Sequence, residues 1–433
     1  MVACRGSRLA PYRHYTRAHF ARHFARAFRL RWFTAARARL APTPTPAFPL
    51  VPLRGAGGFV IFAVMNTSWH WQLEHAYRSL DALKKRFPGM EITESMRKAE
   101  KQFPMAVTPV YADLIETPTF ADPIFAQCVP SAGECIAPPW LSFDPLGEKA
   151  FSPFPRLIRR YPDRAVLLAS SACAVYCRHC TRKRVSATPD CFLTDKELQM
   201  ACEFLRAHPS IEDLLISGGD PLLMEDDALA TILDALRAIP SLRILRICSR
   251  TPATLPQRLT PELIGILAPR RIPGRIRPVG PVTALHTHFN HVRELSDIAL
   301  DALARVVDAG IAVNNQTVLL HGVNDTPDAI EALCRTLYHN RIRPYYLFQC
   351  DLVRGIEHLR TPLATGLDIM RELRVRLSGP AIPNFCLDPP GHGGKIELSP
   401  QSIVAVENHA TLLKNGAGET FLYPDPDSPD SEL

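Results

Sequence analysis

Six short apolar runs alternate with amphipathic stretches through the middle of this chain. Each run has the length of a buried strand, and helical patterns over residues 194–208, 226–239 and 295–310 lie between them. Strand-then-helix units in series predict a parallel sheet, because each crossover helix returns the chain to the end where the strand began. Since such crossovers are right-handed, we predict an α/β fold: a partial (β/α)6 barrel of the TIM type, with an N-terminal helical region and a C-terminal extension. The predicted strands are 165–172, 213–219, 242–250, 283–289, 312–320 and 344–350.

The charge of the chain changes at about residue 65. Residues 1–64 contain eleven Arg, no Lys and no acidic residue, whereas the rest has 39 basic and 43 acidic residues and a net charge of −4. The first stretch fits a targeting arm, a nucleic-acid arm or upstream DNA translated from a wrong start. We favour the last, because Met65 opens an ordinary amphipathic pattern. The predicted divisions are a disordered or mis-annotated extension (1–64), a helical region and connector (65–160), the barrel (161–360) and a C-terminal segment and tail (361–433).

Composition excludes several classes of partner. The mildly acidic body has no clustered basic surface for nucleic acid. The longest apolar run, 59–65, is far shorter than the ~18 residues that span a membrane. The twelve cysteines are dispersed, and no secretory signal pattern opens the chain. We therefore expect reduced thiols, a cytoplasmic location, and neither a nucleic-acid nor a membrane partner.

Three cysteines crowd the loop after the first predicted strand. Cys173, Cys177 and Cys180 have C-x3-C-x2-C spacing, at the strand end where barrels carry their chemistry. Zinc normally takes four ligands, and the sequence offers no second C-x2-C pair; His179 would be an awkward fourth ligand between two of the thiols. An iron–sulfur cube held by three thiolates would leave one iron open to bind another molecule. Unliganded structural cysteines are the third interpretation, which this spacing disfavours.

These and further motifs resemble the radical S-adenosylmethionine enzymes and, within them, the lysine 2,3-aminomutase family. The resemblance runs in order over roughly residues 66–425 and is carried by YPDR…CAVYCRHCTRKR, LLISGGDPLL, SRTPATLPQRLTPEL, THFNH, NNQTVLLHGVND, RPYYLFQCDL, GIEHLRTPL and DPPGHGGK. It implies that the three cysteines bind a 4Fe–4S cluster whose open iron holds S-adenosylmethionine. It also implies that one electron cleaves this molecule to methionine and a 5′-deoxyadenosyl radical.

The resemblance assigns a second cofactor, pyridoxal 5′-phosphate, to Lys395. Alone, this lysine would be interpreted as a solvated surface charge. Glycines at 391, 393 and 394 favour a close-packed cofactor site instead, since they let the backbone approach a ligand. The remaining cofactor-binding residues that the resemblance implies are Arg160, Tyr161 and Arg164 for pyridoxal phosphate, and Ser217, Gly218, Gly219, Asp220, His288 and Gln316 for S-adenosylmethionine.

Three residues carry the substrate prediction. By resemblance, Asp351 and Asp388 pair with the terminal ammonium of the substrate, while Arg182 takes its α-carboxylate. Read separately, each acid would be a helix cap or a surface charge. Two acids facing one amine favour a cationic side chain and would repel glutamate. Lysine is therefore the predicted substrate, and arginine remains an alternative.

The sequence departs from the family pattern at three places. The family's zinc site uses a cysteine in the GVND segment and a C-terminal cysteine cluster, but this chain has Thr326 there and a tail without cysteine. We therefore expect no zinc and do not carry over the subunit contact that it supports. Phe348 stands where the family often has Tyr, and His392 interrupts the glycine run, so the detailed positioning of pyridoxal phosphate is expected to differ.

The resemblance predicts an isomerase that exchanges an α-amino group with a β-hydrogen and converts L-lysine to β-lysine. Its expected partners are the amino-acid substrate, a reductant such as flavodoxin or ferredoxin, and further copies of itself in a homo-oligomer. One alternative is an aminomutase for another amino acid such as arginine, and a second is a lysine aminomutase linked to a translation factor. A third, from a different class, is a non-enzymic iron–sulfur electron carrier or sensor, which would have no use for Lys395 with Arg160 and Arg164.

Overall fold

The computed structural model describes residues 68–186, 192–274, 276–390, 393–399, 401–407 and 409–426. The predicted extension 1–64, the proposed start at Met65, and Gly391 and His392 lie outside these residues. The chain divides into two units, Met1–Phe62 and Ala63–Leu433, and every described residue belongs to the second. The boundaries placed at residues 160 and 360 stay predictions.

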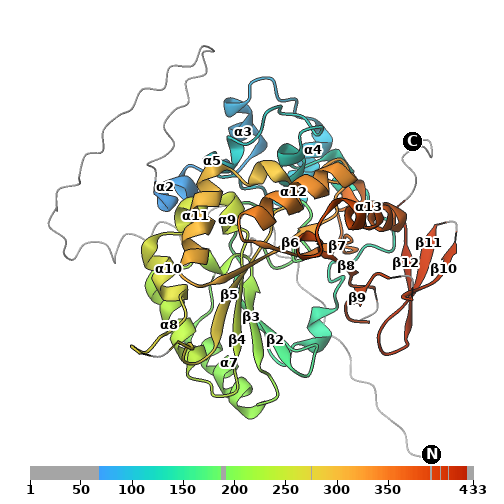
Figure 1. Ribbon diagram of the computed structural model, residues 1–433. Helices are drawn as coiled ribbons and strands as arrows, with labels where there is room; N and C mark the ends of the chain where they lie inside the picture. The colour runs from blue at the N-terminus through green and yellow to red at the C-terminus, as the bar shows by residue number, and fades with distance from the viewer. Residues whose placement is uncertain are drawn as a thin grey trace, which may run out of the picture. The chain divides into compact units, whose positions relative to one another are not determined.

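A nine-stranded sheet forms the centre of the structure (Figure 1), and its strands lie side by side in sequence order. Strands β2 to β8 are parallel, and antiparallel β1 and β9 extend the two edges. Within the described residues no ladder joins β1 to β9, which agrees with a partial barrel. The strands are β1 (Leu157–Ile158), β2 (Arg164–Ser170), β3 (Asp213–Gly218), β4 (Ile244–Cys248), β5 (Val282–Thr287), β6 (Ala312–Val318), β7 (Arg343–Phe348), β8 (Asn384–Leu387) and β9 (Ile396–Glu397).

All six predicted strands are present as β2 to β7, each within two residues of its predicted bounds. The prediction missed β8, a seventh parallel strand that pairs with β7. Its four residues lie between prolines and show no alternation long enough to be recognised. The C-terminal extension therefore contributes directly to the barrel wall.

The crossover helices bury one apolar stripe each against the sheet. In α7 the side chain of Thr194 accepts from Glu197 N, and the Glu197 side chain accepts from Thr194 N, which fixes the start of the helix. Leu205 and Leu233 from these helices pack with Leu214 of β3 in one core. None of the described helices is long and apolar enough to cross a membrane. The helices are α2 (Trp69–Glu74), α3 (Leu80–Arg86), α4 (Glu94–Gln102), α5 (Pro109–Ala112), α6 (Pro123–Cys128), α7 (Asp195–Ala207), α8 (Asp226–Arg237), α9 (Thr251–Thr254), α10 (Pro261–Leu267), α11 (Asp297–Asp308), α12 (Pro327–His339) and α13 (Leu363–Arg376).

The N-terminal helices pack over the loops that follow the strands. Tyr111 of α5 and Val175 of the cysteine loop belong to one apolar cluster. The Thr108 hydroxyl donates to the Thr254 carbonyl, beyond β4, at 2.6 Å. In Figure 1 these helices (blue) lie at the top of the molecule and α7 lies at the bottom. The N-terminal region thus covers the sheet end that carries the cysteine loop.

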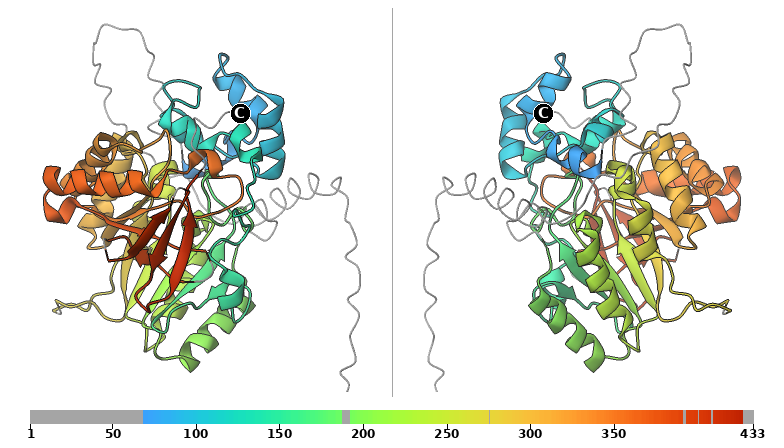
Figure 2. Two further views of the ribbon diagram at one scale, coloured as in Figure 1. Left: turned by 90° about the vertical axis from the view of Figure 1, so that its right-hand side faces the viewer. Right: turned by 90° about the vertical axis from the view of Figure 1, so that its left-hand side faces the viewer.

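A second, antiparallel sheet braces the C-terminal segment. It consists of β10 (Ile403–Glu407), β11 (Ala410–Lys414) and β12 (Thr420–Pro424), which Figure 2 brings to the front in its left view. Asn415 Nδ2 donates to the Gly393 carbonyl at 2.9 Å, and the Tyr423 hydroxyl donates to the Cys350 carbonyl at 3.0 Å. The small sheet therefore supports both the segment that leads to Lys395 and the end of β7.

Candidate active site

The cysteine loop joins β2 to α7 at the carboxyl end of the sheet. Cys173, Cys177 and Cys180 are free thiols, each partly buried. Burial raises the pKa of Cys173 and of Cys177, and the Arg250 guanidinium offsets part of this effect at Cys177. Among the described residues, no three His, Cys, Asp or Glu side chains are placed to hold a metal ion. Since a cube presents a different iron to each thiolate, a cluster needs no such convergence on one point, whereas zinc does.

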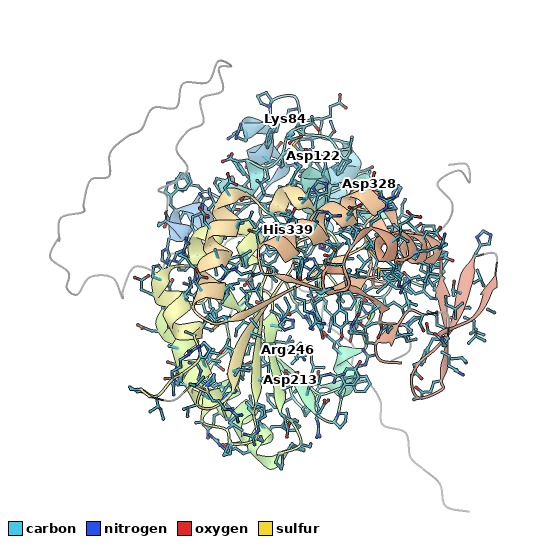
Figure 3. All side chains as sticks on the ribbon, in the orientation of Figure 1. Lys84, Asp122, Asp213, Arg246, Asp328 and His339 are labelled. Carbon is cyan, nitrogen blue, oxygen red and sulfur yellow. The ribbon has the colours of Figure 1, made fainter. Side chains whose placement is uncertain are left out.

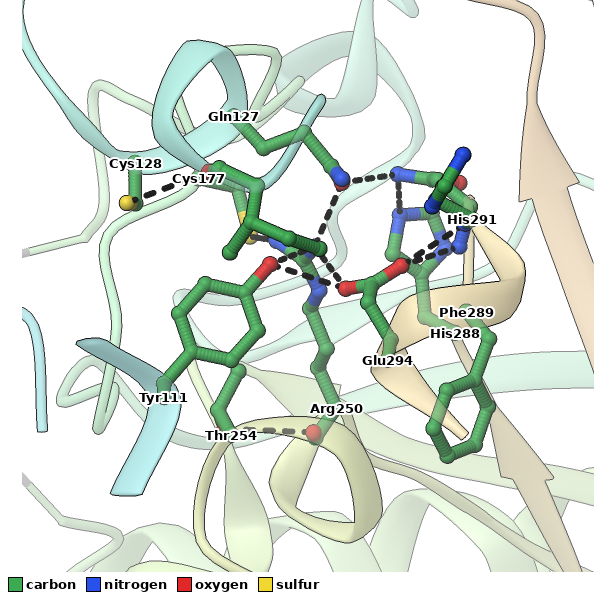
Figure 4. A network of polar contacts seen from close by, with 12 residues as sticks. Tyr111, Gln127, Cys128, Cys177, Arg250, Thr254, His288, Phe289, His291 and Glu294 are labelled. Atoms are coloured by element: carbon green, nitrogen blue, oxygen red, sulfur yellow. Dashed lines mark hydrogen bonds and ion pairs between the residues drawn. The ribbon is translucent and has the colours of Figure 1, made fainter. Parts of the chain in front are cut away.

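A buried arginine positions one of the three thiols (Figure 4). Arg250, directly after β4, donates from Nη1 to Cys177 Sγ at 2.6 Å. Its Nη2 lies 2.7 Å from Glu294 Oε1 and 2.6 Å from Gln127 Oε1. Burial lowers the pKa of Arg250, but the charges of Cys177, Tyr111 and Glu294 raise it well above its ordinary value, so this side chain stays cationic. The SRTP motif gives no indication of this role for Arg250 in the sequence alone.

The SGGDP turn after β3 packs tightly against the start of the cysteine loop. A Cβ on Gly218, whose φ is +116°, would lie 2.1 Å from the Ser170 carbonyl oxygen, and one on Gly219 would lie 2.4 Å from the Ala172 carbonyl oxygen. Only glycine therefore allows this approach. The Ser217 hydroxyl accepts from Arg182 Nη1 at 3.4 Å, which ties the turn to the predicted substrate-binding arginine.

Asp220, predicted to bind S-adenosylmethionine, is engaged within the protein. Its Oδ1 accepts from the Ser249 hydroxyl at 2.7 Å, and its Oδ2 accepts from Arg250 N and Thr251 N, both at 2.9 Å. Burial raises the pKa of this carboxyl in spite of these bonds. Asp220 thus anchors the loop after β4 to the loop after β3, a role that the isolated motif did not indicate.

His288 and Gln316, also predicted to contact S-adenosylmethionine, are half-buried on adjacent strand ends. His288 Nε2 lies 3.0 Å from Nε2 of His179 in the cysteine loop. Burial lowers the pKa of His288 to about 3, so this imidazole is neutral near pH 7. Asn290 Nδ2 lies within 3.3 Å of both imidazoles and links them to the network of Figure 4.

A cavity of about 340 Å³ gathers the remaining predicted residues apart from Asp351. Residues of β2 and of the C-terminal segment both line this cavity, although they are more than two hundred positions apart in the chain. Tyr345 and Tyr346 of β7 and Phe151 supply aromatic walls. The predicted cofactor and substrate residues that line this cavity are Arg160, Tyr161, Arg164, Arg182, Asp388 and Lys395.

Arg160 presents unsatisfied donors at this cavity. Its Nη1 lies 3.5 Å from Asp388 Oδ1. Its Nε and Nη2 are buried and have no hydrogen-bond partner among the described residues. A buried guanidinium with free N–H groups is an anion receptor, since each unpaired donor costs free energy until a ligand fills it.

Lys395 is fixed by its neighbours on both sides. The Tyr161 hydroxyl accepts from Lys395 N at 2.9 Å, and Gly394, with φ of +73°, passes so close that a Cβ there would lie 3.3 Å from the same hydroxyl. The Lys395 ammonium donates to Asp388 Oδ2 at 2.9 Å and lies 3.9 Å from the Phe348 ring centroid. Phe348, noted above as a departure, is therefore a wall beside the reactive amine.

Asp351 follows β7 and accepts from the Thr181 hydroxyl at 2.6 Å. Burial and then the nearby charge of Asp388 raise the pKa of Asp351 to about 6. Two carboxylates that repel each other in this way form a site that a cation would stabilise. The structure thus brings together the two acids that the sequence analysis paired.

Arg182 lies at the cavity, but its guanidinium is paired with an acid that the sequence analysis missed. Arg182 Nη2 lies 2.7 Å from Glu148 Oε1, and Arg184 Nη2 lies 2.6 Å from Glu148 Oε2. Glu148 is buried, and these two arginines hold its pKa below the ordinary value against the effect of burial. Glu148 lies near a proline-rich connector with little periodicity, and nothing in the sequence there indicates that it pairs with Arg182.

Arg246 and Asp213 form a second pair that sequence reasoning did not identify. They lie next to each other on β4 and β3 (Figure 3), with Arg246 Nη2 2.8 Å from Asp213 Oδ2. Both line the 340 Å³ cavity from the sheet side. Because the two charges neutralise each other, the pair places polar groups at the cavity and adds no net charge. The signal in the sequence was that Arg246, a charged residue, interrupts the apolar run of a predicted strand.

The fold and the cysteine loop define a radical S-adenosylmethionine enzyme, since residues 167–335 match the family described as the Radical SAM superfamily. Residues 370–432 match the family described as Lysine-2,3-aminomutase. The chain is 40% identical to the L-lysine 2,3-aminomutase of Fusobacterium nucleatum subsp. nucleatum over 83% of each chain. It is 40% identical to that of Bacillus subtilis over 83% of this chain and 74% of the relative, and 33% identical to the glutamate 2,3-aminomutase of Clostridioides difficile over 83% and 82%. The protein belongs to the lysine 2,3-aminomutase family.

The protein is accordingly an aminomutase, an isomerase that uses a 4Fe–4S cluster, S-adenosylmethionine and pyridoxal phosphate. The residues present fit all three groups. Three free thiols, one of them bonded to Arg250, suit the cluster. Gly218 and Gly219 hold the SGGDP turn against the start of the cysteine loop, next to which S-adenosylmethionine would bind the cluster. The unpartnered Arg160 donors beside Lys395 suit a phosphorylated aldehyde.

Thr326, noted above as a departure from the family pattern, caps a helix. Its hydroxyl accepts from Ala329 N at 3.3 Å at the start of α12. This role needs only a small hydrogen-bonding side chain. The expectation that the protein binds no zinc remains a prediction.

Proposed function

We propose that this aminomutase acts on L-lysine and moves its α-amino group to the β-carbon, which gives β-lysine. The observation that carries the proposal is the pair of Asp351 and Asp388. Their mutual repulsion, added to burial, raises the pKa of Asp351 to about 6. A terminal ammonium between them would relieve the repulsion, whereas the side-chain carboxylate of glutamate would increase it.

In the structure, the ammonium of Lys395 takes the place beside Asp388 that we propose for the ammonium of the substrate. The Lys395 ammonium lies 2.9 Å from Asp388 Oδ2 and neutralises one of the two acids. A lysine amine committed to pyridoxal phosphate no longer offers Asp388 an ammonium. Asp388 is then available to a cationic group of the substrate, while Arg160 remains as its second neighbour.

Arg182 is proposed to bind the α-carboxylate at the opposite end of the substrate. Its Nη1 faces the Ser217 hydroxyl at 3.4 Å, and Glu148 holds the other edge of the guanidinium. A guanidinium fixed on one edge can still donate from the other to a carboxylate in a defined direction. Glu148 would therefore orient Arg182 rather than bind substrate itself.

The cofactors supply the radical and stabilise the migrating amino group, and the chain's own residues orient and enclose the substrate. Tyr161 fixes the backbone of Lys395, Phe348 and Tyr346 shield its amine, and the 340 Å³ cavity limits the space for water. Neutral His288 offers a hydrogen bond without adding charge beside the cysteine loop. Fixed positions of this kind favour one C–H bond over its neighbours.

The test is anaerobic turnover of the full chain. After reconstitution with iron and sulfide, the protein receives S-adenosylmethionine, pyridoxal phosphate, a chemical reductant and L-lysine, L-arginine or L-glutamate in parallel. We expect β-lysine, identified by chiral mass spectrometry, from lysine. A 2,3-shifted product only from arginine or glutamate would reject lysine as the substrate, and a fully loaded protein that releases neither 5′-deoxyadenosine nor a shifted amino acid would favour the non-catalytic carrier or sensor.

The proposal includes a cytoplasmic location, a homo-oligomeric state and reduction by flavodoxin or ferredoxin. Each expectation comes from the sequence. Sedimentation of the reconstituted protein tests the second of them, and a single monomeric species at micromolar concentration would reject it. A link to a translation factor in place of free-lysine metabolism would show as β-lysine transferred to protein in the cell.

A further inference from the structure

A second cavity, of about 410 Å³, opens behind the cysteine loop. Lys183 and Arg184, which follow Cys180 by three and four residues, form part of its lining. None of its residues serves the proposed chemistry apart from Arg184, the neighbour of Glu148. The lining consists of Gln102, Phe103, Glu134, Cys135, Ala137, Phe143, Lys183, Arg184, Val353, Arg354 and Gly355.

The rim of this cavity exposes large apolar side chains. Phe143 is 62% exposed, and Ile136, between two lining residues, is 48% exposed. Exposed apolar side chains at the mouth of a cavity, surrounded by polar residues, mark a surface that another molecule covers. Phe143, Ile136 and Arg354 are called the docking surface below, together with Lys101, which precedes the lining residue Gln102 in α4.

The docking surface is basic. Arg354 is exposed, lies 4.6 Å from the Phe143 ring centroid and forms a cation–π contact there. Lys101, at the end of α4 next to the lining residue Gln102, is also exposed. The acid of the cavity, Glu134, is buried and already paired at 2.6 Å with Arg178. Asp144, which follows Phe143 in the chain, is paired at 3.1 Å with Arg184. The charge that the docking surface itself exposes, on Arg354 and Lys101, is therefore positive, whereas the body of the chain carries a net charge of −4.

An aromatic path leads from this cavity to the thiols. Phe103 lines the cavity, and its ring centroid lies 5.8 Å from that of Tyr176. Tyr176 precedes Cys177 in the chain, and Cys173 packs against the same apolar cluster of Phe103, Ala106 and Tyr176. The cavity and the proposed cluster are thus separated by two packed rings.

We propose that the docking surface binds an acidic one-electron carrier protein, which reduces the cluster through this wall. The carrier loses one electron and the cluster gains it, with no bond formed or broken and no proton transferred. A basic patch with an apolar centre suits an acidic protein whose redox group lies at its surface, because charge steers the encounter and apolar contact holds the complex. This inference rests on the radical chemistry of the proposed function but not on which amino acid is the substrate.

A second copy of the chain fits this surface less well. In a two-fold contact the same patch faces itself, so Arg354 and Lys101 of one copy would meet like charges of the other. An acidic partner meets no such penalty. A subunit contact is kept as an outcome of the test.

The experiment compares Arg354→Glu with Arg206→Glu, a control at an exposed arginine in the last turn of α7. Stopped-flow spectroscopy follows oxidation of flavodoxin hydroquinone by the reconstituted enzyme, with sodium dithionite as a small chemical reductant in parallel. We expect the second-order rate constant with flavodoxin to fall about tenfold or more in Arg354→Glu and to stay unchanged in Arg206→Glu. Arg354→Lys should retain most of the rate, and dithionite should reduce all variants equally.

Phe143→Ala gives a second, uncharged test of the same surface. Its rate with flavodoxin should fall while its rate with dithionite does not. Equal losses with both reductants would overturn the proposal, since they would show damage to the cluster site. Unchanged flavodoxin rates in both variants, or a change of oligomeric state in Phe143→Ala by sedimentation, would also overturn it. Reduction needs no amino-acid substrate, so these results are independent of whether lysine is turned over.

Discussion

The two ends of the active site differ in how they are built. At the cysteine end, Arg250 and Glu294 form a buried ion pair, and Arg250 also donates to Cys177 at 2.6 Å. At the cavity end, two buried donors of Arg160 have no partner among the described residues, and Asp351 has a raised pKa beside Asp388. The first end is organised by its own charges, whereas the second pairs some of its charges, as Lys395 does with Asp388, and leaves the Arg160 donors for a charge that a ligand must bring.

This difference follows from what each end must hold. A cluster is assembled from bare thiols, so a cation next to Cys177 keeps that ligand oriented and favours the thiolate. Pyridoxal phosphate and an amino acid arrive with their own anionic and cationic groups, so a cavity that matched its charges internally would have none to offer them. The variants below test this contrast, from the largest expected effect to the smallest.

Cys177→Ala should abolish turnover, because the cluster loses a ligand and no radical can form. Iron and acid-labile sulfide analysis, together with the visible spectrum, should show the loss of the cluster. Cys135→Ser, at an exposed cysteine outside the loop, is the control and should keep it. Turnover retained by Cys177→Ala would refute its role as a ligand.

Lys395→Ala should also abolish turnover but leave the cluster intact, which separates the two ends. The covalent attachment point of pyridoxal phosphate is removed, while the cysteine loop is untouched. After borohydride treatment, mass spectrometry should find the cofactor attached to the wild-type chain and absent from the variant. Covalent cofactor in Lys395→Ala would move the attachment to another lysine.

Glu294→Gln should lower the free energy of unfolding by about 3 kcal/mol, because it leaves the Arg250 cation buried without its counter-charge. The hydrogen bonds that Glu294 Oε2 accepts from Asn290 N and His291 N would also weaken. Urea unfolding of the apoprotein measures the change, and Glu262→Gln, at an exposed position of α10, is the control. An equal, small effect in both variants would show that the pair does not organise the cysteine end.

Asp351→Asn should weaken lysine binding by about tenfold, the value of one charged hydrogen bond. In the wild type, KM for lysine should rise as the pH falls from about 7.5 to 5.5, since protonation near the Asp351 pKa of about 6 removes one of the two charges that face the amine. The groups that act on Asp351 are Asp388, Thr181, Lys395 and Arg182. The variant should lack this dependence, and a KM that follows pH equally in both proteins would assign the titration to another group.

The raised pKa of Asp351 also makes the stability of the folded protein depend on pH. Its pKa is higher in the folded protein than in the unfolded chain, so its contribution to stability is present at low pH and is lost as the pH rises through about 6. The substrate-free wild type should therefore lose stability relative to Asp351→Asn as the pH rises from about 4 to about 6. Lysine added at pH 7 should restore it in the wild type alone.

Motifs with local chemistry were predictable from the sequence. The six strands β2 to β7 were predicted from runs of apolar residues. A buried strand is apolar throughout, and a half-buried strand is apolar at every second residue, so both patterns can be recognised in the sequence. The cysteine spacing indicated a cluster for a similar reason: three ligands in one loop need no long-range contact to be recognised. Among the parallel strands of the described residues, β8 was missed, since four residues between prolines carry too little pattern, and the short antiparallel strands β1, β9 and β10 to β12 were not predicted either.

The tertiary structure decided which residues that are far apart in the chain form hydrogen bonds and ion pairs with each other. Nothing near Arg250 in the sequence announces that it meets Cys177 and Glu294, and nothing near Glu148 announces Arg182. Asp220 is predicted to bind S-adenosylmethionine, and only the fold shows that both its oxygens also bond to the loop after β4. The sequence by itself determined the class of fold, the cysteine loop and the family of the enzyme. Which charges are paired and which wait for a ligand depended on packing, because burial sets the free energy of a charge and only the folded chain determines burial.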